Sequence, residues 1–163
     1  MMTIHLLMDG AKGSSSDQPH KDWIDIVQLC WGSRRRITAN SSTRDDRESS
    51  NAEISALTFT KYLDESTPAL FLEACCGRGQ TMTVDMTYTG AGAGARTYNR
   101  YVLHNAVVSE YKMAAWAQEG ERPLEKIKIS FTRVELRYSP SDQDNRPLPP
   151  ISVSFDTATN SKG

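Results

Sequence analysis

Apolar and polar residues alternate with a period of two over several stretches of the chain. The clearest stretch is 80–88, in which four apolar side chains alternate with threonines and one aspartate: Met82, Val84, Met86 and Tyr88. Such alternation gives a β-strand one buried face and one solvated face. Shorter stretches of this kind lie at 4–8, 23–31 and 57–62, and a last short strand is expected at 152–156. The pattern predicts a mainly β protein.

Two longer stretches alternate but change phase midway. The apolar parity changes at Thr132-Arg133 within 127–138, and at His104-Asn105 within 101–108. A phase change inside one long strand indicates a β-bulge or a sharp bend, which lets the strand belong to two sheet surfaces. We expect both positions to be corners of a small barrel or sandwich.

One helix is predicted between Thr67 and Gly77. Thr67 is a capping residue, Pro68 suits the first helical position, and Gly77 can end the helix. Asp64 and Glu65 precede it, where acidic side chains favour the positive end of a helix. At helical spacing, one side is expected to face the core: Leu70, Phe71, Ala74 and Cys75.

The length and composition fit one domain, 1–163. With 19 basic and 20 acidic residues the net charge is -1, which argues against a protein whose main task is to bind nucleic acid. No apolar stretch approaches the roughly 20 residues of a membrane-spanning helix. The first eight residues also lack the features of a cleavable signal peptide. We therefore expect neither nucleic-acid binding nor membrane insertion.

The sequence offers little that resembles an active site. The three histidines, His5, His20 and His104, share no metal-ligand spacing, and the glycines of 90–94 match no phosphate-binding loop. No catalytic triad or carboxylate pair can be assembled. The adjacent Cys75 and Cys76 are expected to be reduced, buried small hydrophobes. We predict no catalytic residue, no cofactor and no metal ligand.

Two groups of motifs resemble a known family. The first lies near the N-terminus: Asp9-Gly10-Ala11-Lys12-Gly13-Ser14, then Asp17, His20, Ile24-Asp25-Ile26 and Trp31-Gly32. The second is more specific: Phe59-x-Lys61-x-x-Asp64, Ser66-x-Pro68-x-Leu70 and Cys75-Cys76-Gly77. With the strand at 134–138, their order resembles the Hcp (haemolysin-coregulated protein) family, which forms the inner tube of type VI secretion systems. The chain departs from many members at Ser15, where they have Glu, and in its charged segments 34–36 and 44–48.

The resemblance implies a two-sheet β-barrel with one short flanking α-helix, assembled into hexameric rings that stack into a tube. It implies partners: further copies of the chain, spike, sheath and baseplate components, and small protein effectors carried in the lumen. It also implies synthesis in the cytoplasm and secretion without a cleaved signal peptide, and a structural role instead of an enzymatic one.

Two candidate surfaces follow for such a tube. The polar loop at about 33–51 is the candidate ring-stacking segment, through charges that could pair between rings: Arg35, Arg36, Arg44, Asp45, Asp46, Arg47 and Glu48. A merely solvated loop is the alternative. If Leu29 and Trp31 face the core, then Gln28 and Cys30 face the other way, either into the lumen or against a neighbouring subunit.

A second reading of the β pattern is a monomeric β-barrel that binds a small ligand in its own interior. We expect the C-terminal tail at about 139–163 to be too short for the fused effector domain that some members of the resembled family carry. Ring-shaped oligomers in solution would favour the tube subunit, whereas a monomer with a closed apolar cavity would favour the ligand-binding barrel.

Overall fold

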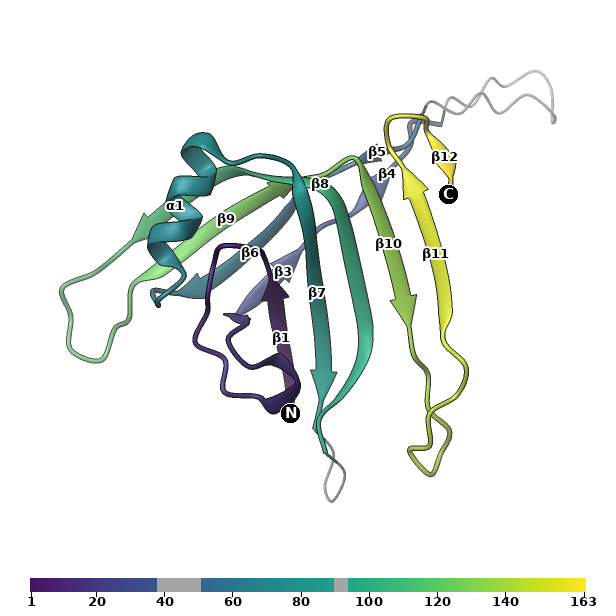
Figure 1. Cartoon of the computed structure of the whole chain (residues 1–163), viewed down its shortest axis with the longest axis horizontal. Helices are drawn as coiled ribbons and strands as arrows, with labels where there is room; N and C mark the ends of the chain where they lie inside the picture. The colour runs from purple at the N-terminus through teal and green to yellow at the C-terminus, as the bar shows by residue number, and fades with distance from the viewer. Residues whose placement is uncertain (38–50, 90–93) are drawn as a thin grey trace.

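The computed structural model describes residues 1–37, 51–89 and 94–163. Within these ranges the fold is mainly β, with one α-helix, α1 (Thr67–Cys76), and a single 3-10 turn, η1 (Gln18–His20) (Figure 1). None of its helices is long and apolar enough to cross a membrane. The strands are β1 (Met2–Leu7), β2 (Ile24–Ile26), β3 (Gln28–Cys30), β4 (Ser33–Arg34), β5 (Glu53–Ile54), β6 (Leu57–Tyr62), β7 (Gln80–Tyr88), β8 (Arg96–Ala114), β9 (Leu124–Ser130), β10 (Arg133–Tyr138), β11 (Ile151–Asp156) and β12 (Ser161–Lys162).

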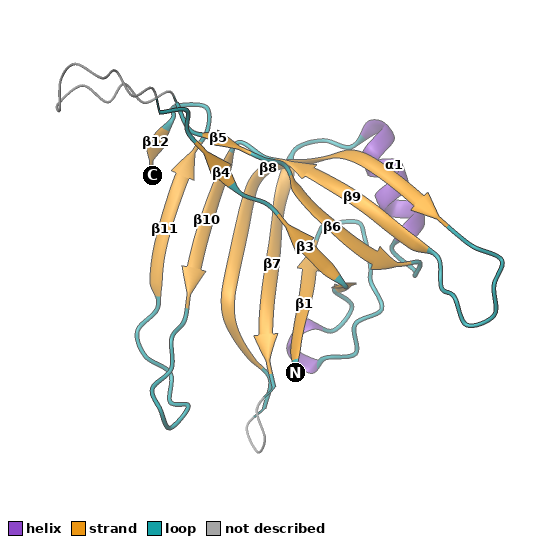
Figure 2. Ribbon diagram, turned by 180° about the vertical axis from the view of Figure 1, so that it is seen from behind, coloured by secondary structure: helices purple, strands orange, loops and turns teal. Residues whose placement is uncertain are grey.

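Ten of the described strands form two layers that share β8, and β4 and β5 pair with each other in a separate two-stranded sheet. The seven-stranded layer has the order β12-β11-β10-β8-β7-β1-β2, and the four-stranded layer has the order β3-β6-β9-β8. All of these pairings are antiparallel. The long β8 pairs with β7 and β10 before residue 107 and with β9 over 107–114. Figure 2 shows the two layers diverging on either side of this strand.

The phase changes in the sequence mark the corners between the layers, as predicted. Asn105 in β8 has a φ of 50°, a left-handed conformation that Asn tolerates better than most residues. At the second phase change the chain divides into β9, in the four-stranded layer, and β10, in the seven-stranded layer. A third corner, which we did not predict, lies at Val27 between β2 and β3. There the buried parity passes from Ile24 and Ile26 to Leu29.

The mainly β, two-layer architecture with one helix agrees with the predicted two-sheet β-barrel, but the barrel is not closed, because the described sheets are open. Among the described strands, β12, β2 and β3 each have one strand neighbour, so both layers end in unpaired edges. The core fills the space between the layers. Its large, fully buried apolar side chains come from both: Leu6, Met82, Val84 and Leu103 from the seven-stranded layer, and Leu57, Phe59, Ile127 and Ile129 from the four-stranded layer.

Helix α1 lies against β8 and is joined to the core through Leu70, which is fully buried. Its bounds agree with the sequence, although Ser66 takes the N-cap position in place of Thr67. The expected buried side is only half right. Ala74 packs against the core, whereas Phe71 and Cys75 are exposed. The helix is apolar on nearly every side, so helical spacing alone could not distinguish the inner face from the outer face.

Candidate functional site

The outward face of the four-stranded layer is a polar surface. Gln28 and Cys30 in β3 are exposed there, whereas Leu29 and Trp31 pack against the core. Gln28 lies opposite Thr60 in β6, and Cys30 lies opposite Thr58. Thr60 in turn lies opposite Lys126 in β9, and Thr58 lies opposite Lys128. Cross-strand neighbours thus form two adjacent rows across the layer.

The β8 side of this surface carries most of its charge. Glu110 accepts ion pairs from Lys128 at 3.0 Å and from Lys112 at 3.2 Å. Hydrogen bonds and the positive charges of these two lysines lower the pKa of the Glu110 carboxyl. Lys126 lies opposite Lys112 across the β8–β9 pairing. The surface is therefore neutral along β3 and β6 and mainly basic along β9 and β8.

Two edges of the four-stranded layer lack a neighbour in the described chain. One is β3, which pairs with β6 alone, and the other is the 107–114 half of β8, which pairs with β9 alone. Both carry backbone groups that can accept another strand, and exposed edges of this kind are where chains add to one another. These edges lie at opposite sides of one layer, so a second copy could be added at each.

A buried ionic cluster holds α1 against this layer. Lys61 on β6 and Glu125 on β9 are both fully buried and form an ion pair of 2.5 Å. Lys61 also contacts Asp64 at 2.8 Å. Glu125 accepts hydrogen bonds from Tyr111 at 2.6 Å and from Thr67 at 3.0 Å. Buried charges persist only when paired and hydrogen-bonded, and every member here has such partners.

This cluster explains the most specific sequence motif in physical terms. The Lys and Asp of Phe59-x-Lys61-x-x-Asp64 form one of its two ion pairs. Ser66, the first residue of the next motif, donates its hydroxyl and backbone N–H to Asp64. Burial opposes ionisation of Asp64, but the hydrogen bonds from Lys61 and Ser66 outweigh it and lower its pKa. Burial and the hydrogen bond to Glu125 raise the pKa of Tyr111 to about 12.

A second polar cluster lies on the outward face of the seven-stranded layer. The rings of His5 and His20 stack with centroids 4.6 Å apart and an interplanar angle of 9°. The His5 ring bonds Asp25 at 2.9 Å, and the His20 ring bonds Asp17 at 2.6 Å and Asp85 at 2.8 Å. Sequence spacing gave no sign of this group, because strand pairing and the η1 loop bring its members together.

Asp85 anchors that cluster through two hydrogen bonds of 2.6 Å from Arg100. Burial raises the pKa of Asp85, but the hydrogen bonds and charges of Arg100 and His20 outweigh burial, so the net pKa is lowered. Ligand atoms of His5, Asp17 and His20 lie within 4.8 Å of one another, a spacing that could hold a metal ion. The four ring nitrogens already have protein partners, Thr3 being the fourth, which supports a role in fixing the η1 loop.

The cysteines differ from expectation, and the charged loop lies partly outside the described residues. All three cysteines are free and exposed, so the prediction that Cys75 and Cys76 are buried is wrong. Of the candidate ring-stacking residues, Arg35 and Arg36 are exposed. The other five lie outside the described residues: Arg44, Asp45, Asp46, Arg47 and Glu48.

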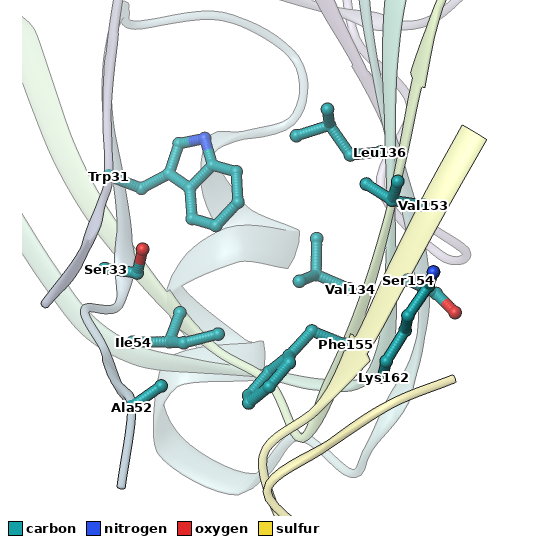
Figure 3. A pocket seen from close by; sticks show the side chains of 10 residues that line it. All are labelled: Trp31, Ser33, Ala52, Ile54, Val134, Leu136, Val153, Ser154, Phe155 and Lys162. Atoms are coloured by element: carbon teal, nitrogen blue, oxygen red, sulfur yellow. The ribbon is translucent and has the colours of Figure 1, made fainter. Parts of the chain in front are cut away.

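An apolar cavity of about 350 Å³ opens where the two layers fail to close. One wall carries Trp31 and Ile54, and the facing wall carries Val134, Leu136, Val153 and Phe155 from β10 and β11 (Figure 3). The Trp31 ring also contacts Tyr101 edge-on, with centroids 5.2 Å apart. We call this feature the open cavity. The sequence did not predict it, since it results from the sheets being open.

Comparison with known proteins assigns this fold to a family. Residues 5–138 match the family described as "Type VI secretion system effector, Hcp". Protein hcp1 of Pseudomonas aeruginosa is 25% identical over 133 residues, which cover 82% of this chain and 80% of that protein. A solved structure described as a type six secretion system protein superposes with a TM-score of 0.90 at 25% identity, covering 100% of both chains. Hcp1 from Salmonella typhimurium superposes with a TM-score of 0.75 at 20% identity, covering 99% of both. The match along most of the chain and the shared fold agree with the motif order, and the chain belongs to the Hcp family of type VI secretion system proteins.

Proposed function

We propose that this chain is the structural subunit of a type VI secretion tube, in which copies join side by side into hexameric rings and the rings stack. The observation that carries the proposal is the four-stranded layer, with its polar outward face and an unpaired edge on each side. A head-to-tail contact between two different edges of the same molecule generates a ring when its rotation closes. Family membership supports the same assembly.

The number of strands in the layer suits such a contact. Since each strand runs antiparallel to its neighbour across β3-β6-β9-β8, the two edge strands run in opposite directions. Joining β8 of one copy to β3 of the next would therefore continue the antiparallel order without interruption. Closure of the ring would then use up both edges, which are otherwise sites of uncontrolled pairing.

In such a ring we place the outward face of the four-stranded layer toward the lumen. Gln28 and Cys30 would then line the channel beside Thr58 and Thr60, and the lysines of β9 would add positive charge. Effectors carried there would meet a polar wall, which favours release because it offers little apolar surface to bury. The alternative is that Gln28 and Cys30 pack against a neighbouring subunit, in which case both side chains would be inaccessible to solvent in the ring.

The remaining partners follow from the same role. We propose that the loop at 33–51 contributes to stacking between rings, and that the assembled tube meets spike, sheath and baseplate components before its secretion. A structural role needs no catalytic residue or cofactor. The alternative of a ligand-binding barrel has less support, because it needs an enclosed interior and the described sheets are open.

Light scattering and negative-stain imaging of the purified protein test the proposal. We expect annular particles, since a closed ring pairs both free edges of every copy. Their mass should be that of about six chains, the number that the resemblance to the Hcp family implies. Hydrogen exchange should show strong protection of β3 and of residues 107–114 in the assembly. Particles with the mass of one chain at high concentration would contradict the tube role. Assembled rings with fast exchange at both edges would contradict only the pairing of β8 with β3.

A further inference from the structure

Helix α1 carries an apolar surface that a single chain leaves uncovered. Its exposed side chains recur at helical spacing as Pro68, Phe71, Leu72 and Cys75. Phe71 is 55% exposed and Leu72 is 59% exposed, while the opposite side is anchored by the fully buried Leu70. Among its ten residues, Glu73 is the one charged side chain. A helix that is apolar all round normally lies buried, so this surface fits an interface.

The open cavity presents the complementary shape at the far end of the molecule. It is concave and apolar, whereas the exposed side of α1 is a convex ridge. The helix lies at one end of the long axis, and β4, β5 and β11 lie toward the other (Figure 1). One chain therefore cannot cover its own cavity with its own helix.

Charge also favours this match. α1 contains no Lys or Arg, and the exposed Glu65 lies just before its first residue. The rim of the open cavity carries Lys162, and the nearby Glu53 is already paired with Arg34 at 2.8 Å. The contact would thus place the Glu65 carboxylate near the Lys162 ammonium. The described residues that line the open cavity include no Asp or Glu.

The edge pairing described above would bring the two surfaces together. The Phe71 ring contacts the Tyr111 ring, with centroids 5.8 Å apart, so α1 lies directly on the free-edge half of β8. Trp31 follows β3 immediately and points into the open cavity (Figure 3). A copy that adds its β3 to this β8 would set its open cavity beside α1.

We propose that the Phe71–Leu72 ridge of α1 inserts into the open cavity of the adjacent copy and closes the space that the adjacent copy's own sheets leave open. This inference rests on the proposed ring and adds the surface that holds its copies together. Burial of two large apolar side chains in a fitted cavity is the kind of contact that dominates interface energetics.

Site-directed cross-linking tests the insertion. Cys75 already provides a thiol on the ridge. Cys30→Ser and Cys76→Ser remove the other two thiols, so that Cys75 is the one native cysteine left, and Val153→Cys adds a second thiol in the open cavity. A short bismaleimide should then join the copies into a covalent ladder that ends at the ring size. The matched control is Ser152→Cys, an exposed neighbour on the opposite face of β11, which should give no ladder.

Charge insertion supplies a second readout. Leu72→Arg and Val153→Arg should each convert the rings to single chains in light scattering without lowering the melting temperature of the single chain, since both side chains are exposed there. Leu7→Arg, at an exposed apolar position on β1, should leave the rings intact. Intact rings in both arginine variants, or rings without a Cys75 ladder, would overturn the insertion alone. A wild-type chain that never assembles would overturn the tube proposal as well.

Discussion

The Lys61 ammonium and the Glu125 carboxylate, from neighbouring strands of the four-stranded layer, meet with no solvent exposure of either side chain. Their pairing ties β6 and β9 to α1, because Thr67 at the start of the helix also bonds Glu125. The cluster lies on the core side of the four-stranded layer, opposite the polar outward face of that layer. Ion pairing and hydrogen bonding in this cluster therefore hold α1 against the four-stranded layer, in addition to the burial of Leu70.

Removal of one partner from this pair should be costly. We expect Lys61→Met to lower the free energy of unfolding by about 3–5 kcal/mol, because it leaves a buried carboxylate without its cation. Urea unfolding measures the loss. The double variant Lys61→Met/Glu125→Leu should lose less, since it also removes the fully buried carboxylate that the single variant leaves without a cation. Asp64 then keeps its two hydrogen bonds from Ser66. Equal losses in the single and double variants would show that the unpaired Glu125 carboxylate is not what destabilises the single variant.

Asp85 should make the protein sensitive to acid. Its pKa lies below the ordinary value of 3.8, so on acidification the unfolded chain takes up a proton on this group before the folded chain does. The stabilisation it gives is thus complete above about pH 4 and is lost as the pH falls through the lowered folded-state pKa. Thermal melts from pH 6 to pH 2 should show a smaller acid-dependent drop for Asp85→Asn than for the parent chain. An unchanged slope would remove Asp85 from this role.

Leu70 and Phe71 are adjacent but should respond differently to truncation. Leu70→Ala should destabilise the single chain by about 2–5 kcal/mol, because it opens a cavity in the core. Phe71→Ala should change the stability of the single chain little, since Phe71 is more than half exposed. Denaturant unfolding below the assembly concentration separates the two. A large loss for Phe71→Ala would mean that its contact with Tyr111 matters more to the subunit than its exposure indicates.

Gly13 should not tolerate a side chain, whereas Gly32 should. A Cβ at Gly13 would lie 2.3 Å from the backbone oxygen of Trp23, while a Cβ at Gly32 would have no atom within 4 Å. Gly13→Ala should therefore displace the loop that covers His5 and His20, at a cost of about 1–3 kcal/mol. Gly32→Ala is the matched control. Faster hydrogen exchange of residues 13–23 in the first variant alone would confirm the prediction, and its absence would contradict it.

Sequence patterns were sufficient for the longer strands and two of the corners, because period-two alternation reports directly on which face is buried. The two-residue strands β4, β5 and β12 are too short to show such a pattern. They also located α1 through Pro68 and Gly77. The outer face of the helix could not be recognised, since Phe71 and Cys75 are as apolar as the residues that do face the core. The open sheets were missed because closure depends on where each edge strand ends in space.

The two polar clusters differ in how visible they were. Lys61 shares the inward parity of Leu57 and Phe59, and Glu125 shares that of Ile127. Opposite charges at inward positions of two strands were therefore a signal that alternation could have revealed. The His5 and His20 pair left no such trace. Asp85 lies opposite His5 in the register of β1 with β7 and bonds His20 65 positions away, and only strand pairing and the η1 loop bring these residues together.

The bend at Asn105 has a consequence for the width of a channel. At three corners, within β8, between β9 and β10, and between β2 and β3, the backbone passes from one layer to the other, so the angle between the two layers is set by the chain of each copy. The inner diameter of a ring assembled from such copies would then depend mainly on the backbone of each copy. Substitutions at the contacts between copies would change the strength of those contacts more than the diameter.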